Sequence, residues 1–268
     1  MLILFSRIGC YQQGCWEAAE DDSELEASCN YLAPERGAQS AIRTNVRYNM
    51  GFRIILTLIA SLACGAEAAF PCYEGEPDTE CVYRFGEKQI HKLDVTDSVF
   101  EEDVGYGTAI LLSSGQYLTN RHVVDHDEDI EPAFWLNGRE LQIVDLSEDS
   151  DLALVESNLW PNTDELADWA TQEPRGGARV YSVGWPSGFA LIVQEGLYHT
   201  NMEGNLTSTA QIYPGNSGGA LVQVKDGEVQ ILGVTTQGLH TQGNFTNVSW
   251  SIPAEDVLNF LLEADDGW

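Results

Sequence analysis

Short β segments separated by turns fill the chain between residues 95 and 252, and this pattern restricts the fold more than any other feature. Asn137-Gly138 and Asp226-Gly227 each lie between two such segments, and these dipeptides are typical of tight β-hairpin turns. Many short strands at this spacing, with almost no helical periodicity among them, predict either a β-sandwich or β-barrels. The candidate strands cover residues 95–100, 106–112, 117–119, 132–136, 141–146, 152–155, 178–183, 190–198, 206–213, 220–224, 229–236 and 248–252.

One clear helix is expected, over residues 254–263. Pro253 precedes it, and proline is favoured where a helix begins. Val257, Phe260 and Leu261 fall at positions i, i+3 and i+4, so they share one helical face. We therefore expect this face to pack on the last sheet.

The charge of the chain is strongly negative. Its 13 Lys and Arg residues and 42 Asp and Glu residues give a formal net charge of −29. Such a surface repels nucleic acids and anionic membranes, so neither is an expected partner. The acidity is compatible both with adaptation to salt and with a preference for cationic substrates.

The front of the chain contains a candidate export signal. Residues 1–49 show no sustained hydrophobic period, so this segment is predicted to be disordered or not part of the native protein. A zinc or disulfide role for Cys10, Cys15 and Cys29 is the alternative. A short basic start at Met50 leads to an apolar run and then to a small-x-small cleavage pattern. Residues 50–69 are therefore predicted to be a signal peptide, which implies a periplasmic or secreted protein without stable membrane insertion. A lipid-modified Cys64 is the alternative reading of this signal.

Two cysteines remain after the predicted cleavage, Cys72 and Cys81, in an N-terminal segment over residues 70–94. Cysteines this close together in an exported chain are expected to form one local disulfide. Two free thiols are the alternative.

A serine flanked by glycines stands at the centre of the segment Tyr-Pro-Gly-Asn-Ser-Gly-Gly-Ala, residues 213–220. A serine hydroxyl is a weak nucleophile unless a base takes its proton and N–H groups receive the charge on the substrate oxygen. Gly215 can adopt backbone angles that direct its N–H and that of Ser217 at one point. A glycine-rich hairpin turn with an incidental serine is the alternative.

A histidine and an aspartate upstream decide between these alternatives. His122 lies where a buried strand ends, and Asp151 lies just before another, at residues 152–155. A carboxylate beside a histidine fixes its tautomer and stabilises the imidazolium that forms when serine loses its proton. Each residue alone has a structural explanation, but together with Ser217 they favour a nucleophilic triad.

Several segments together resemble the trypsin/chymotrypsin-fold serine peptidases, and more closely their bacterial HtrA-like branch. The main matches are Thr-Asn-Arg-His-Val-Val at 119–124, Asp-Leu-Ala-Leu-Val at 151–155 and Pro-Gly-Asn-Ser-Gly-Gly-Ala-Leu at 214–221. The segments 183–186 and 231–236 also match, so the resemblance covers about residues 95–265.

This resemblance implies the fold, the chemistry and the substrate class. It implies an all-β fold of two packed antiparallel β-barrels with a C-terminal helix, in a peptidase domain over residues 95–268. Barrel 1 would cover about 95–165 and barrel 2 about 178–252. By the same resemblance Ser217 attacks the peptide carbonyl, His122 shuttles the proton, Asp151 orients His122, and the N–H groups of Gly215 and Ser217 form the oxyanion hole. Polypeptides are then the substrates, and no cofactor or metal is required.

The same resemblance places a substrate pocket near Gln211 at its base, with Thr235, Thr236 and Gln237 along its wall. Because Gln211 is not a carboxylate, we do not expect the pocket to select strongly for Lys or Arg. We expect it to accept a small or medium apolar side chain of the substrate.

Asn216 cannot form the ion pair with a freed N-terminus that activates digestive relatives. No PDZ-like segment is expected after the helix. A catalytically silent peptide-binding or chaperone-like module is the alternative function.

The acidic residues between Asp125 and Glu131 could hold calcium or form a solvated loop.

Overall fold

A computed structural model of the chain describes residues 19–21, 24–26, 70–98, 103–126, 132–158, 161, 163–241 and 244–265. The chain divides into two units, Met1–Ala66 and Glu67–Trp268. In the first unit, β1 (Ala19–Asp21) pairs antiparallel with β2 (Glu24–Glu26). The predicted signal peptide, Cys10, Cys15, Cys29, Cys64 and most of the candidate calcium loop lie outside the described residues.

The second unit contains a closed first barrel in the strand order β4-β5-β6-β9-β8-β7, with every neighbouring pair antiparallel. Alternate residues of its strands point inward, and Leu93, Val95 and Leu111 are among those that form its buried core. The six strands are β4 (Ile90–Asp97), β5 (Asp103–Leu111), β6 (Tyr117–Thr119), β7 (Pro132–Leu136), β8 (Arg139–Leu146) and β9 (Ala153–Glu156).

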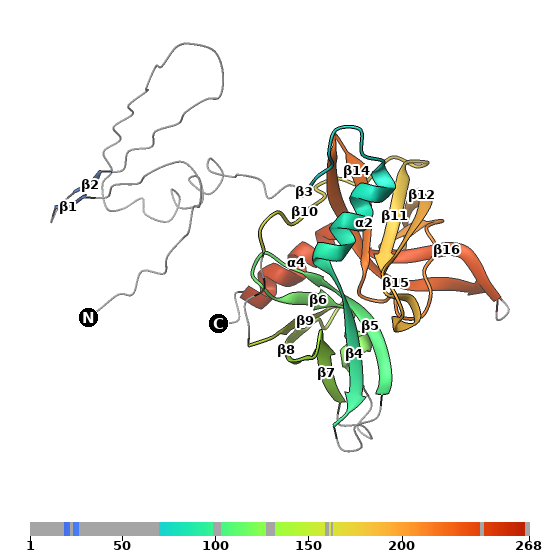
Figure 1. Ribbon diagram of the computed structural model, residues 1–268, viewed down its shortest axis with the longest axis horizontal. Coiled ribbons are helices and arrows are strands. Elements are labelled where there is room, and N and C mark those ends of the chain that lie inside the picture. Colours follow the sequence, from blue (N-terminus) through green and yellow to red (C-terminus); the bar gives the residue numbers. More distant parts are fainter. Residues whose placement is uncertain are drawn as a thin grey trace, which may run out of the picture. The chain divides into compact units, whose positions relative to one another are not determined.

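A second barrel follows in the order β11-β12-β13-β16-β15-β14, and the pairing of β14 with β11 closes it (Figure 1). Two short strands add to β15: β3 (Phe70–Pro71) runs antiparallel to it and β10 (Asp168–Trp169) parallel. The expected all-β architecture of two antiparallel barrels is therefore confirmed. The ring strands are β11 (Arg179–Gly184), β12 (Ile192–Met202), β13 (Asn205–Ser208), β14 (Ala220–Lys225), β15 (Glu228–Thr241) and β16 (Asn244–Pro253).

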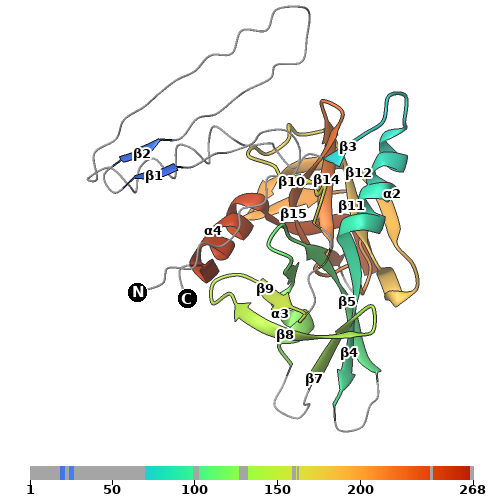
Figure 2. The same cartoon turned by 60° about the vertical axis from the view of Figure 1, so that its left-hand side comes forward.

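The C-terminal helix α4 (Ala254–Asp265) begins directly after β16 and lies beside β15 and β16 (Figure 2). Val257 and Phe260 are buried and Leu261 is partly buried against the core, so the helix packs through the face that its sequence period predicts. Among the described helices, none is both long and apolar enough to cross a membrane.

A second long helix, α2 (Asp78–Gln89), is present where the sequence pattern predicts none. Cys81, Val82 and Phe85 are buried on one face of it, although Arg84 between them and charged residues on either side weaken the apolar period. The disulfide Cys72–Cys81 ties this helix to the segment that follows β3, as expected from the cysteine spacing.

The position of this helix also alters the start of barrel 1. Because α2 ends at Gln89, β4 begins at Ile90 and not at the expected residue 95. The Gln89 side chain joins helix and barrels, since its amide nitrogen donates to the carbonyl of Leu111 and its oxygen accepts from the amide of Ala167.

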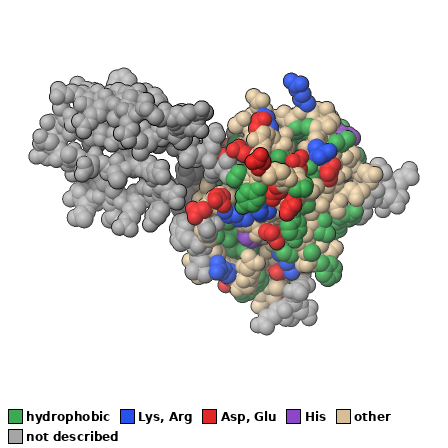
Figure 3. Space-filling model, turned by 45° about the horizontal axis from the view of Figure 1, so that its top comes forward, with side chains coloured by type: hydrophobic (Ala, Val, Ile, Leu, Met, Phe, Trp, Pro, Cys, Tyr) green, Lys and Arg blue, Asp and Glu red, His purple; other side chains and the backbone are tan. Residues whose placement is uncertain are grey.

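Acidic and basic side chains lie interspersed among hydrophobic and polar ones on the face shown in Figure 3. The large negative charge of the chain is therefore not gathered into one acidic patch on this face.

Candidate active site

Strand pairing in barrel 1 brings His122 and Asp151 together. His122 belongs to α3 (Arg121–Val124), a single turn that follows β6, and Asp151 lies just before β9. Since β6 pairs antiparallel with β9, with Thr119 opposite Ala153, the residues beyond the end of one strand meet those before the start of the other. The buried Asn120 side chain reinforces this arrangement by donating to the backbone carbonyl of Asp151 at 2.8 Å.

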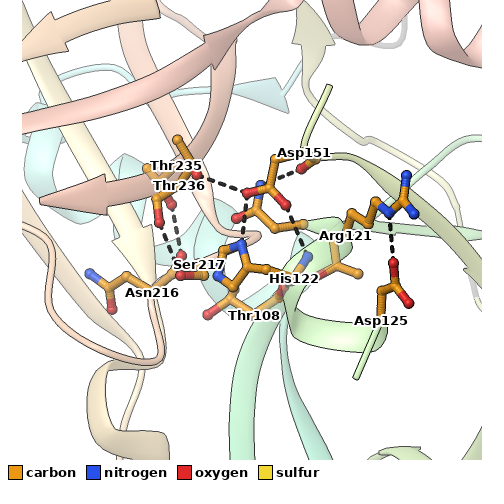
Figure 4. Close-up of polar contacts among 11 residues, drawn as sticks. Thr108, Arg121, His122, Asp125, Asp151, Asn216, Ser217, Thr235 and Thr236 are labelled. Carbon is orange, nitrogen blue, oxygen red and sulfur yellow. Dashed lines mark hydrogen bonds and ion pairs between the residues drawn. The ribbon is translucent and has the colours of Figure 1, made fainter. Parts of the chain in front are cut away.

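The carboxylate of Asp151 holds His122 at two points (Figure 4). One oxygen lies 2.7 Å from His122 Nδ1, and the other accepts a hydrogen bond of 2.9 Å from the His122 backbone amide. An ionised carboxylate only accepts, so Nδ1 must carry the proton and Nε2 keeps the lone pair that a base requires.

The ionisation of Asp151 suits this role. Burial raises the pKa of its carboxyl group, but hydrogen bonds from the His122 ring and backbone, attraction to His122 and a hydrogen bond from Thr236 together lower that pKa below its usual value. The group therefore stays charged at neutral pH. Because the folded-state pKa is lowered, this carboxylate stabilises the fold above its unfolded pKa, and the contribution is lost as the pH falls through the folded pKa.

Thr236 on β15 connects this pair to the serine. Its hydroxyl donates to Asp151 Oδ2 at 3.0 Å, and its carbonyl accepts from Ser217 Oγ, also at 3.0 Å (Figure 4). Barrel 2 thus helps to orient a carboxylate of barrel 1. The sequence reasoning missed this contact and placed Thr236 only on a pocket wall, because a threonine within a strand carries no signal of such a bond.

Ser217 lies in the turn-rich connection between β13 and β14, where the sequence pattern predicts a strand as far as residue 213. Its carbonyl accepts from the amide of Thr108 on β5 at 2.8 Å, and the next amide, that of Gly218, donates to Thr235. The Ser217 hydroxyl points to Thr236 and makes no hydrogen bond with His122 among the described contacts. Proton transfer to His122 therefore requires a rotation of the serine side chain.

The turn before Ser217 depends on glycine at position 215. Gly215 has φ +97°, and a Cβ there would lie 2.6 Å from the carbonyl oxygen of Trp185 and 2.8 Å from the Tyr106 ring. Its carbonyl accepts from the Thr108 hydroxyl at 2.7 Å. Within the described contacts, neither the Gly215 amide nor the Ser217 amide donates to a protein acceptor, so both remain available to a ligand oxygen.

A cavity of about 860 Å³ contains His122, Asp151 and Ser217 in its lining, and Thr236 and Gln237 extend that wall. The other two residues assigned to the pocket lie elsewhere.

Thr235 is buried, and its hydroxyl donates to the carbonyl of Asn216, so it supports the serine turn from behind. Gln211 is not among the lining residues; it donates to Asn247 and accepts from the hydroxyl of Tyr213, which does line the cavity.

Residues 107–234 match the family model of the trypsin-like peptidase domain. This stretch, just under half of the chain, is therefore similar to a trypsin-like peptidase domain. Among similar curated proteins, a probable periplasmic serine protease do/HhoA-like of Haemophilus influenzae is 29% identical over 60% of this chain and 36% of its own length. The periplasmic pH-dependent serine endoprotease DegQ of Escherichia coli is 31% identical over 57% of this chain and 35% of its own. The chain therefore spans about a third of the length of these relatives.

Two solved structures share the fold of this chain. The Rv3671c protease of M. tuberculosis in its active form aligns with a TM-score of 0.57 at 19% identity, covering 68% of this chain and 83% of that one. The serine endoprotease of Yersinia pestis aligns with a TM-score of 0.56 at 20% identity, covering 69% and 67%. The resemblance on which the sequence reasoning rests, to trypsin-fold serine peptidases and their HtrA-like branch, is confirmed.

Proposed function

We propose that this chain is an exported serine endopeptidase that cleaves polypeptides through an acyl-enzyme. The observation that carries the proposal is the set of hydrogen bonds joining His122, Asp151, Thr236 and Ser217 on the wall of one cavity. Nucleophile, base and orienting carboxylate on the wall of one cleft are the parts that acyl transfer requires.

Each residue has one role in the proposed reaction. After rotation of its side chain, Ser217 transfers its proton to His122 Nε2 as its oxygen attacks the peptide carbonyl. Asp151 stabilises the imidazolium that results, and the amides of Gly215 and Ser217 receive the charge on the carbonyl oxygen. His122 then protonates the leaving amine, and a water molecule attacks the acyl-enzyme by the reverse sequence.

One observation favours the alternative of a catalytically silent peptide-binding module, namely the hydrogen bond from Ser217 to Thr236 in place of one to His122. Catalytic hydrogen bonds are often misaligned in the absence of substrate, and rotation about one side-chain bond changes the partner of a hydroxyl. The complete triad and the available amides therefore support the peptidase more strongly than the silent module.

The relatives support the location as well as the chemistry. The two curated relatives are named as periplasmic proteases, which agrees with the signal peptide predicted at residues 50–69. N-terminal sequencing of the native product tests this part: a mature chain that begins close to Ala69 is expected, and one that contains Cys10 would contradict it.

Labelling with a fluorophosphonate tests the chemistry directly, since this probe reacts with an activated serine. We expect the wild-type protein and the Ser114→Ala control, which removes an exposed turn serine, to be labelled equally. Ser217→Ala should not be labelled. An unlabelled wild-type protein that is folded, at low and high salt, would support the silent module.

A further inference from the structure

Carboxylates that are far apart in the sequence meet in the cavity that contains Ser217. Asp149 comes from the loop before β9, Glu203 from the tip of the hairpin between β12 and β13, and Asp256 from the first turn of α4. The pairing of Leu206 with Ser251 places that hairpin beside β16, and α4 begins where β16 ends. This is why Glu203 and Asp256 lie at the same cavity.

Within the part of the chain that the structure describes, no lysine or arginine pairs with these three carboxylates. The lining of the cavity, as far as the chain is described, contains no lysine or arginine. None of the three forms an ion pair among the described contacts; the nearby Arg121 is held by Asp125 at 2.8 Å and by the carbonyl of Ser147. Burial, and then repulsion from Glu255, raises the pKa of Asp256, as expected for a carboxylate without a positive partner.

The surface between the serine and these carboxylates is partly apolar. Ile212, Trp250 and Ile252 line the same cavity. Lysine and arginine side chains lay their methylene groups on apolar surface and extend their charged ends to polar partners. An aromatic face such as that of Trp250 also attracts cations. The cavity therefore matches a long cationic side chain better than a short apolar or an acidic one.

We propose that Glu203 and Asp256 make the peptidase prefer substrates that carry Lys or Arg close to the cleaved bond. This inference rests on the proposed function and adds a substrate class to it. It also revises the expectation drawn from Gln211: selection for a cation does not need a carboxylate at that position, because two residues from distant elements supply the charge.

Peptide series that differ at a single position test this preference. Each position on either side of the cleaved bond carries Lys, Gln or Glu in turn, and kcat/KM is measured for the mature protein. Because exposed charge pairs are individually weak, we expect Lys to exceed Gln by about three- to tenfold at the responsive position, with Glu below both. The ratio should shrink at about 1 M salt, where the screening length falls to about 3 Å.

Two double variants with the same change in net charge locate the effect. Glu203→Gln with Asp256→Asn should bring the Lys-to-Gln ratio close to one. Glu87→Gln with Glu140→Gln alters two exposed residues outside the cavity and should keep the wild-type ratio. Thermal unfolding checks that both variants fold.

Each outcome bears on one proposal. A wild-type protein that fluorophosphonate labels but that cleaves Lys and Gln peptides equally would overturn the cationic preference and leave the peptidase proposal standing. A ratio that survives in the cavity variant, or that both variants lose alike, would also overturn it. Absence of labelling would instead reject the peptidase itself.

Discussion

Removal of the Thr236 hydroxyl should slow catalysis without unfolding the protein. In Thr236→Val the methyl group replaces a hydroxyl that donates to the Asp151 carboxylate at 3.0 Å. A hydrogen bond to a charged group contributes about 1.5–3 kcal/mol, and we take the lower end because the Asp151 side chain is 33% exposed. A loss of about 1.5 kcal/mol of orientation corresponds to roughly a tenfold lower kcat/KM.

The pH dependence should change in the same variant. The Thr236 hydrogen bond is one of the contacts that lower the pKa of Asp151, so its removal raises that pKa. Protonation of Asp151 then begins at a higher pH, and the acidic limb of the kcat/KM profile should move upward. Kinetics on one peptide across acidic and neutral pH measures both effects.

Two controls separate positioning from a general loss of stability. Thr236→Ser retains the hydroxyl and should recover most of the activity. Thr207→Val removes a threonine hydroxyl that donates to the carbonyl of Thr200 elsewhere in barrel 2, and should affect stability alone. If Thr236→Val retains wild-type kcat/KM and its acidic limb while remaining folded, the hydrogen bond has no part in catalysis and the reasoning is wrong.

Three further outcomes are expected. Gly215→Ala should reduce fluorophosphonate labelling about 100-fold or more, because the added Cβ displaces the turn that presents an oxyanion donor. The control Gly227→Ala changes a glycine at φ +82° with open space around it, and this variant should be labelled normally. Burial lowers the pKa of His91 to about 4, so the unfolded chain takes up a proton before the folded one as the pH falls. Between about pH 6.5 and 4, the unfolding free energy of the wild type, measured with urea, should therefore fall by about 2–3 kcal/mol more than that of His91→Gln. Parallel plots of unfolding free energy against pH would contradict this. Replacement of Cys72 and Cys81 by serine should cost about 2–3 kcal/mol of unfolding free energy, and a reductant should destabilise the wild type but not this variant.

Local signals in the sequence were sufficient for much of the fold. The dipeptides Asn137-Gly138 and Asp226-Gly227 all have positive φ, which tight hairpin turns require and which these residue types tolerate. The helix after Pro253 buries the face that its period predicts. Helix α2 was not predicted from the sequence because charged residues interrupt its apolar face, and only its packing against the barrels shows which of its residues are buried.

The sequence by itself determined which residues could do chemistry: a serine between glycines, a histidine after one buried strand and an aspartate before another. Their residue types and strand-end positions are local properties, so one chain read in order is enough to find them. Only the tertiary structure decided that Thr236 holds Asp151, that Thr235 lies behind the serine turn, and that Glu203 and Asp256 line the cleft. Barrel closure and the pairing of β13 with β16 create these contacts. The register between strands that are distant in the sequence cannot be read from the residues that this pairing brings together.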